Sequence, residues 1–213
     1  MTTGEKPSCR EFFDGLAAGW DDGTHHDPEK LAFIADLLAL RPGHAALDVG
    51  CGTGVMVPQL LARVANGGGG SGRVVGVDFS AEMIAVARRK FPAVEFPNVE
   101  FLICDVDELP EGPTYDGVVC YSCFPHFRDQ AGTTRLLARR LRPGGRLLVA
   151  HSESRDAIND MHRGFSEPVR ADYLPPVAEI GAMMEDAGLA VVCEVDSADA
   201  FVVGGELRPS SRP

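Results

Sequence analysis

The sequence predicts one α/β domain in which helices cover both faces of a largely parallel β-sheet. The first observation is that short apolar runs alternate along the chain with segments of helical periodicity. The second is that these runs are apolar throughout, which is typical of strands buried on both faces. The third is size, because 213 residues, 45% hydrophobic and 24% charged, suffice for one ordinary domain with a sizeable core.

The first element that the pattern predicts is a helix near the N-terminus. Leu31, Ile34 and Leu38 fall on one face of this helix. Asp27 precedes it as the cap, and Pro28 takes the first position, where the missing N–H of proline costs nothing.

Strands and helices then alternate through the middle of the chain. Pro58 is tolerated near the first turn of its helix, and Ser80 is placed to cap the next one. The segment Arg142–Gly145 is a stop signal for the helix before it. The expected strands are Ala45–Val49, Arg73–Val77, Val99–Cys104, Gly117–Cys120 and Arg146–Ala150, and the expected helices are Val55–Ala65, Ala81–Lys90 and Gln130–Leu141.

A different pattern follows toward the C-terminus. Val177–Ala187 predicts a helix that stops at Gly188. Leu189–Val195 and Ala200–Val203 predict an antiparallel hairpin. We therefore expect a single domain over residues 1–206, with a helical cap or lid at 1–40 and the sheet core at 41–206, a loop in the glycine-rich run Asn66–Gly72, and a flexible tail at 207–213.

The charge balance restricts the partners. The chain has 20 Lys and Arg against 31 Asp and Glu, a formal net charge of -11. Nucleic acids and anionic membranes both select basic surfaces, so we expect neither as a partner. Met1–Arg10 lacks the apolar core of a signal peptide, and the apolar stretch Leu31–Leu40 is too short to span a bilayer. With six scattered cysteines, these features predict a soluble protein of the reducing cytoplasm.

A glycine-rich turn gives the strongest local signal. Gly50, Gly52 and Gly54 alternate directly after an expected strand and before a helix, and Asp48 precedes them. Glycines at such a turn let the backbone pass close to a ligand. The spacing is G-x-G-x-G and differs from the G-x-G-x-x-G of dinucleotide-binding folds. The alternative is a tight strand-to-helix turn without a ligand.

Two further acids follow the next expected strands. Asp78 ends the second strand and Asp105 the third, so both fall at the edge where open α/β sheets bind ligands. An acid in the place of Asp78 accepts hydrogen bonds from ribose hydroxyls, although Asp78 can also be a mere neighbour of a helix cap. Carboxylates at this edge repel a pyrophosphate and favour a ligand with a cation and hydroxyls, such as S-adenosylmethionine.

Five segments carry a more specific signal: Leu47–Gly54, Val75–Ser80, Asp105, Tyr115–Val119 and Leu141–Leu147. In order and spacing they resemble the motifs of class I S-adenosylmethionine-dependent methyltransferases, over roughly residues 30–150. The resemblance implies a Rossmann-like seven-stranded sheet of strand order 3-2-1-4-5-7-6, with the last strand antiparallel and helices on both faces.

The resemblance also implies where the cofactor binds. The methionine end of S-adenosylmethionine would lie on the three glycines, and Asp78 would hold the ribose. Asp105 and the backbone of Val106 would meet the adenine, and Cys120 falls where the backbone often contacts the cofactor amino group. The residues assigned to S-adenosylmethionine, with S-adenosylhomocysteine as the product, are Asp48, Gly50, Cys51, Gly52, Gly54, Asp78, Phe79, Met83, Asp105, Val106 and Cys120.

Histidines follow two adjacent strands of the expected sheet. Methyl transfer from a sulfonium is a direct displacement, so the protein mainly aligns the reactants and, for a protonated nucleophile, supplies a base. His126 and His151 are the candidate bases. Tyr121 is a candidate for orienting the acceptor. The alternative for each histidine is a hydrogen bond to a loop backbone, and for Tyr121 it is a place in the pocket wall.

Other polar residues are candidates for contact with the acceptor. Asn159 and His162 share a helical stripe with Arg155, and this stripe either faces solvent or packs over the crevice. An N-terminal lid would bring His25, His26 and Trp20 to the same opening, with Phe12 and Phe13 on its underside. The candidate acceptor residues are Trp20, His25, His26, Cys123, Asn159 and His162.

Cys120-x-x-Cys123 suggests a redox pair or half of a zinc site. No second Cys-x-x-Cys exists, so zinc would need histidine ligands, and we assign no metal. The thiols are compatible with a soft acceptor such as a thiol, a metalloid or a corrinoid. The run His151–His162 is similar to a subgroup of these enzymes associated with corrinoid-linked or other small-molecule methylation.

These observations predict a methyltransferase that moves a methyl group to a small-molecule acceptor. The Asn/Asp-Pro-Pro-Tyr motif of amino-methylating nucleic-acid enzymes is missing after the fourth strand. Two alternatives stay open at this point, a nicotinamide-dependent oxidoreductase and a non-catalytic S-adenosylmethionine-binding protein.

Overall fold

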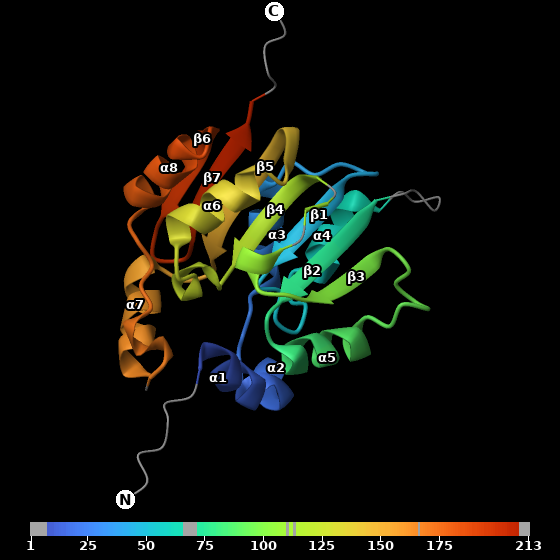
Figure 1. Cartoon of the computed structure of the whole chain (residues 1–213), viewed down its shortest axis with the longest axis vertical. Helices are drawn as coiled ribbons and strands as arrows, with labels where there is room; N and C mark the ends of the chain where they lie inside the picture. Colours follow the sequence, from blue (N-terminus) through green and yellow to red (C-terminus); the bar gives the residue numbers. More distant parts are fainter. Residues whose placement is uncertain (1–7, 66–71, 110, 113, 166, 209–213) are drawn as a thin grey trace, which may run out of the picture.

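A seven-stranded sheet of order β3-β2-β1-β4-β5-β7-β6 forms the centre of the computed structural model (Figure 1), which describes residues 8–65, 72–109, 111–112, 114–165 and 167–208. β7 is antiparallel to both neighbours, and the remaining pairs are parallel. The strand order implied by the resemblance is therefore confirmed. The strands are β1 Ala45–Val49, β2 Arg73–Asp78, β3 Val99–Ile103, β4 Tyr115–Tyr121, β5 Leu141–His151, β6 Leu189–Asp196 and β7 Phe201–Leu207.

Helices cover both faces of the sheet, as the apolar strands predicted. On one face the core contains Ile34, Leu60 and Ile84 from α3, α4 and α5. On the other it contains Leu137 and Met184 from α6 and α8. The α-helices are α1 Cys9–Leu16, α2 Trp20–Gly23, α3 Pro28–Leu37, α4 Val57–Val64, α5 Ala81–Lys90, α6 Gln130–Ala138, α7 Arg155–Gly164 and α8 Val177–Asp186, and the short 3-10 helices are η1 Ala17–Gly19, η2 Val106–Glu108, η3 Phe124–His126 and η4 Val169–Ala171.

The predicted helix ends are mostly confirmed. The Asp27 carboxylate accepts the Glu29 N–H at 2.8 Å ahead of α3, and Ser80 Oγ accepts the Met83 N–H at 3.1 Å ahead of α5. Gly188 follows α8 with φ +84°, the left-handed conformation that ends many helices.

One predicted boundary is wrong. The helix expected to reach Leu141 ends at Ala138, and β5 begins at Leu141. Leu141 pairs with Tyr115, and the register then shifts before Arg146 pairs with Gly117. The Pro-Gly-Gly segment is therefore an irregular part of the strand, because sheet pairing holds its two sides in place.

Two expected flexible segments fall largely outside the described residues, namely 66–71 of the glycine-rich run and 209–213 of the tail. Leu207, which the prediction placed in the tail, ends β7. In the described part of the chain, none of the helices has the length and apolarity that crossing a bilayer requires.

The N-terminal helices lie at the same end of the sheet as α7 (Figure 1). Asp14 of α1 accepts a hydrogen bond from Ser80 Oγ at 2.5 Å, and Asp21 of α2 pairs with Lys90 Nζ at 2.7 Å. These contacts attach the N-terminal segment to α5, beside the turns that follow β1 and β2.

Candidate active site

The turn after β1 requires glycine at its first position. Gly50, Gly52 and Gly54 have φ of +63°, +52° and +87°, in the left-handed region that side chains disfavour. A Cβ on Gly50 would also lie 2.5 Å from Cys123 Cβ, whereas one on Gly52 would meet nothing within 4 Å. The turn therefore passes close to the loop after β4, and only glycine fits there.

Asp78, at the end of β2, fixes the shape of this turn. Its two carboxylate oxygens accept the N–H of Gly52 at 2.9 Å and of Ser80 at 2.8 Å. Burial raises the pKa of Asp78, and the two backbone hydrogen bonds offset part of that rise.

Asp48 lies in β1, two residues before this turn, and is 1% exposed. Its Oδ2 has no hydrogen-bond partner among the described residues. Burial, together with the nearby charge of Asp78, raises the pKa of Asp48 to about 8. A buried carboxyl group with a free oxygen is suited to a cationic ligand, which would stabilise its charged form.

Asp48 should make the ligand-free protein less stable as the pH rises. Its folded-state pKa of about 8 lies above the unfolded value of ~3.9. Between these two values the folded state holds a proton that the unfolded state has lost, so a rising pH favours unfolding until the folded state also loses it near pH 8. We expect the free energy of unfolding to fall between pH 5 and 8 with a slope of up to about 1.4 kcal/mol per pH unit. Urea unfolding over this range measures the slope.

Asp48→Asn should flatten that slope. Asp156→Asn is the control, because the side chain of Asp156 is 89% exposed, and this variant should keep the wild-type slope. An Asp48→Asn variant with an unchanged slope would contradict the assignment.

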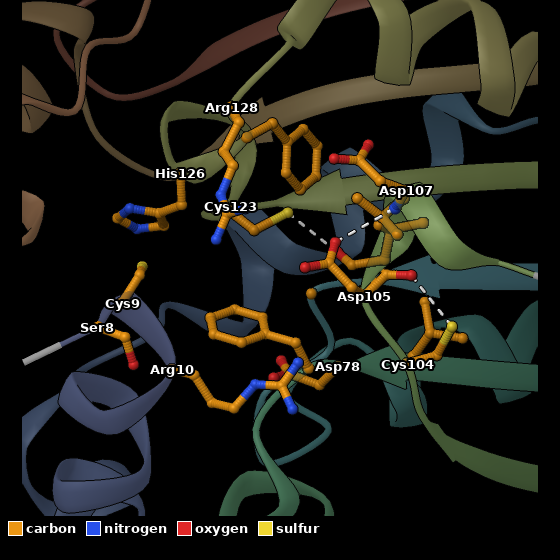
Figure 2. A pocket seen from close by; sticks show the side chains of 16 residues that line it. Ser8, Cys9, Arg10, Asp78, Cys104, Asp105, Asp107, Cys123, His126 and Arg128 are labelled. Carbon is orange, nitrogen blue, oxygen red and sulfur yellow. Dashed lines mark hydrogen bonds between the residues drawn. The ribbon is translucent and has the colours of Figure 1, made fainter.

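A first cavity lies over the ends of β1 and β2 (Figure 2). Five of the residues assigned to the cofactor line it: Gly50, Asp78, Phe79, Asp105 and Val106. Residues of α1 close it from the side of the lid, and the guanidinium of Arg10 lies 5.8 Å from the Phe79 ring centroid. The other assigned residues do not contribute to the wall, namely Asp48, Cys51, Gly52, Gly54, Met83 and Cys120.

A second cavity of about 480 Å³ lies beside the first, under the N-terminal helices and α7. Phe12, Phe13, Trp20 and Phe165 give its wall an aromatic character. Five of the six histidines of the chain line it: His25, His26, His126, His151 and His162.

His126 is the residue that joins the two cavities, because it lines both. Its Nδ1 lies 2.5 Å from Oδ2 of Asp172, the residue after η4. Its ring packs edge-on against Phe13 and His162, at centroid distances of 5.0 and 5.1 Å. The sequence analysis missed Asp172, and no motif surrounds it that could have revealed it.

His151 ends β5 and is 2% exposed. Both of its ring nitrogens are buried without a partner among the described residues. Burial, followed by the charges of His126 and His162, lowers the pKa of His151 to about 3. The ring is therefore neutral at physiological pH and has one donor and one acceptor available to a ligand.

Tyr121, predicted to contact the acceptor, lies behind the wall of the second cavity. Its hydroxyl donates to Ser152 Oγ at 2.8 Å and lies 2.9 Å from His26 Nδ1. The tautomer of His26 decides which of the two donates in this contact, and His26 Nε2 has no partner among the described residues. Tyr121 therefore positions His26.

The α7 stripe faces inward at two positions. Asn159 is buried and exchanges two hydrogen bonds with the backbone of Leu174, at 2.8 and 3.1 Å, so its amide fastens α7 and is not free for an acceptor. His162 is also buried and reaches the cavity wall. The solvent-facing interpretation is wrong for both.

Cys123, predicted on the acceptor side, lines the first cavity instead. Its Sγ donates to the Val49 carbonyl at 3.0 Å, and burial raises the pKa of the thiol. Cys120 is fully buried in β4.

Unpartnered polar atoms concentrate at this site. Five buried side-chain nitrogen or oxygen atoms lack a partner in the described part of the chain. Four are imidazole nitrogens of His26, His151 and His162, and the fifth is Asp48 Oδ2. Such atoms destabilise a fold unless a ligand satisfies them, and the three histidines line the second cavity, so this cavity has the features of a binding site.

Comparison with known proteins identifies methyltransferases as relatives of this chain. The family described as a methyltransferase domain matches residues 46–145. The chain is similar to the 2-phytyl-1,4-naphtoquinone methyltransferase of Thermosynechococcus vestitus, with 36% identity over 139 residues, 65% of this chain and 58% of the relative. It is also similar to an O-methyltransferase of Pyrenophora dematioidea, with 30% identity over 195 residues, 84% of this chain and 71% of the relative.

A solved S-adenosylmethionine-dependent methyltransferase from Aquifex aeolicus has the same fold, with a TM-score of 0.67 at 23% identity over 94% of this chain and 100% of that one. The chain spans between 33% and 60% of the length of four curated relatives that it matches.

Proposed function

Because this chain belongs to the class I S-adenosylmethionine-dependent methyltransferases, we propose that it transfers a methyl group from S-adenosylmethionine to a small molecule bound in the second cavity. The observation that carries the proposal is the position of His126 in the walls of both cavities. Methyl transfer needs donor and acceptor in contact and in line, and the two cavities adjoin at this residue.

The residues that line the first cavity support the methyl donor as its ligand. Gly50 allows the backbone to approach a ligand, and Asp78 and Asp105 supply carboxylates for hydroxyl and amino groups. The unpartnered Asp48 oxygen lies in β1 behind the cavity wall, two residues before Gly50, and favours a positive charge nearby. S-adenosylmethionine supplies a methyl group on a positively charged sulfur, which is a ready leaving group.

The second cavity supports a compact, largely apolar acceptor that carries a hydrogen-bonding group. Phe13 and Trp20 offer ring faces and edges, while His151 and His26 offer unpartnered nitrogens. A neutral His151 accepts a hydrogen bond from a hydroxyl or thiol and so aligns its lone pair with the methyl group. The related enzyme that methylates 2-phytyl-1,4-naphthoquinone acts on a ring compound. Thiols, metalloids and corrinoids remain acceptors to be tested.

Binding of the demethylated product tests the first step. At 100 times its dissociation constant, S-adenosylhomocysteine should stabilise the protein by about 2.7 kcal/mol and raise the Tm by roughly 5–10 °C. NAD should produce no such shift, since the carboxylates of Asp78, Asp105 and Asp107 outnumber the two arginines in the wall and disfavour a pyrophosphate. A Tm that rises with NAD and not with S-adenosylhomocysteine would establish the oxidoreductase alternative.

Methyl transfer itself is measured with labelled S-adenosylmethionine and a panel of phenols, quinols, thiols, arsenite and a reduced corrinoid. We expect label in at least one ring-bearing hydroxyl or thiol compound. Tight binding of S-adenosylmethionine with no label transferred to any class would establish the non-catalytic alternative.

A further inference from the structure

A group of potential metal ligands lies at the edge of the first cavity, and it includes His126, the residue at which the two cavities adjoin. Cys9 Sγ, an imidazole nitrogen of His126 and a carboxylate oxygen of Asp172 all lie within 4.8 Å of one another. They come from α1, η3 and the segment after η4, which are far apart in the sequence. Figure 2 shows the Cys9 sulfur directed at the imidazole of His126.

From this geometry we propose that Cys9, His126 and Asp172 form a binding site for a zinc-class divalent ion. Sulfur, imidazole nitrogen and carboxylate oxygen are the three donor types that zinc uses in proteins, whereas a thiolate disfavours Mg²⁺ and Ca²⁺. A thiolate and a carboxylate together balance the charge of the ion. The site differs from the Cys120-x-x-Cys123 half-site considered from the sequence, whose two thiols are both buried.

The present spacing needs only a small adjustment. Zinc binds nitrogen and oxygen at about 2.0–2.2 Å and sulfur at about 2.3 Å, which places tetrahedral ligand atoms more than ~3 Å apart. The contact of 2.5 Å between His126 Nδ1 and Asp172 Oδ2 would therefore open by about 1 Å as the ion replaces the hydrogen between them. All three side chains are partly exposed, so an ion can reach them.

Three protein ligands leave a fourth position open to water or a small ligand, as in zinc sites that are not purely structural. His162 is a second feature beside the group, because it is 3% exposed and its Nδ1 lacks a partner. Its ring packs on His126 at 5.1 Å, so a metal-bound water would have an imidazole nearby to accept its hydrogen. A bound ion would also fasten α1 to the segments that carry His126 and Asp172.

Titration of the whole chain with Co²⁺ under reducing conditions tests the site. Co²⁺ binds at zinc sites and, when bound to a thiolate, absorbs strongly in the near ultraviolet. We expect one Co²⁺ per chain with this thiolate absorption, which Zn²⁺ then abolishes by displacing the cobalt. Absence of the absorption in the wild type would overturn the proposal and leave His126 and Asp172 as a hydrogen-bonded pair.

Two matched cysteine variants locate the thiolate. Cys9→Ser should lose the absorption, while Cys193→Ser, a partly exposed cysteine on β6, should keep it. Asp172→Asn should keep the absorption and bind Zn²⁺ at least about 10-fold more weakly by calorimetry. Absorption that survives Cys9→Ser, or Zn²⁺ affinity unchanged by Asp172→Asn, would contradict the ligand set. None of these readouts depends on methyl transfer, so the metal site and the proposed function can fail separately.

Discussion

Gly50→Ala is expected to lower the free energy of unfolding by about 3 kcal/mol and to weaken S-adenosylhomocysteine binding by about 100-fold or more. Two independent costs add. Alanine at φ +63° costs roughly 1–2 kcal/mol. Its methyl group would also lie 2.5 Å from Cys123 Cβ and 2.8 Å from Cys123 Sγ, and overpacking of this kind costs roughly 1–3 kcal/mol.

Binding of S-adenosylhomocysteine should weaken because the backbone that would move to accommodate the new methyl group forms the wall of the first cavity. Cys123 belongs to the loop after β4 and, like Gly50, lines the first cavity. Moving either backbone to make room changes the shape of the cavity wall. The affinity for S-adenosylhomocysteine is measured by calorimetry, and stability by urea unfolding.

Gly52→Ala is the matched control. Gly52 has nearly the same backbone conformation, with φ +52°, but a Cβ there meets no atom within 4 Å. It should therefore show only the conformational cost of about 1–2 kcal/mol. Equal destabilisation in the two variants would show that the contact with Cys123 is relieved without cost.

His151→Leu is expected to reduce turnover by at least about 100-fold and at the same time to leave the protein as stable as before or more stable by about 1–2 kcal/mol. Turnover falls because His151 is proposed to align the acceptor. Stability does not fall, because both ring nitrogens are buried without a partner and leucine removes that cost.

Opposite effects on turnover and stability would distinguish a functional group from a structural one. If His151 held the fold together, its substitution would lower the stability of the protein, and turnover would fall only in proportion to the folded fraction. His44→Leu is the control, since His44 is absent from the walls of both cavities, and its turnover should be unchanged. Binding of S-adenosylhomocysteine to His151→Leu should also be unchanged, and its loss would reassign His151 to the first cavity.

Several features could be read from the sequence because their causes are local. The glycine-rich turn and the helix after it were predicted correctly. The turn needs left-handed φ values, which glycine adopts readily, and proline fits near the first turn of a helix. The boundary at Leu141 was wrong for the opposite reason. Arg-Pro-Gly-Gly usually ends an element, but pairing of Leu141 with Tyr115 draws this segment into the sheet.

The acceptor side was predicted less well. His126, His151 and His162 do line one cavity, but Asn159 is committed to Leu174 and Tyr121 acts behind His26. The direction of a side chain at the end of a strand or on a short helix depends on which segment packs against it. Periodicity along one element does not contain that information.

The order of short apolar strands and helices predicted a largely parallel sheet covered on both faces, and the glycines predicted the turn after the first strand, because periodicity and backbone sterics act within a few residues. The strand order followed from the resemblance to class I methyltransferases. Only the tertiary structure decided that Asp172 holds His126, that Cys9 faces them, and that two cavities adjoin at His126. These groups come from segments that meet only when the N-terminal helices and the η4 segment pack over the same end of the sheet. Their chemistry is therefore a consequence of long-range packing.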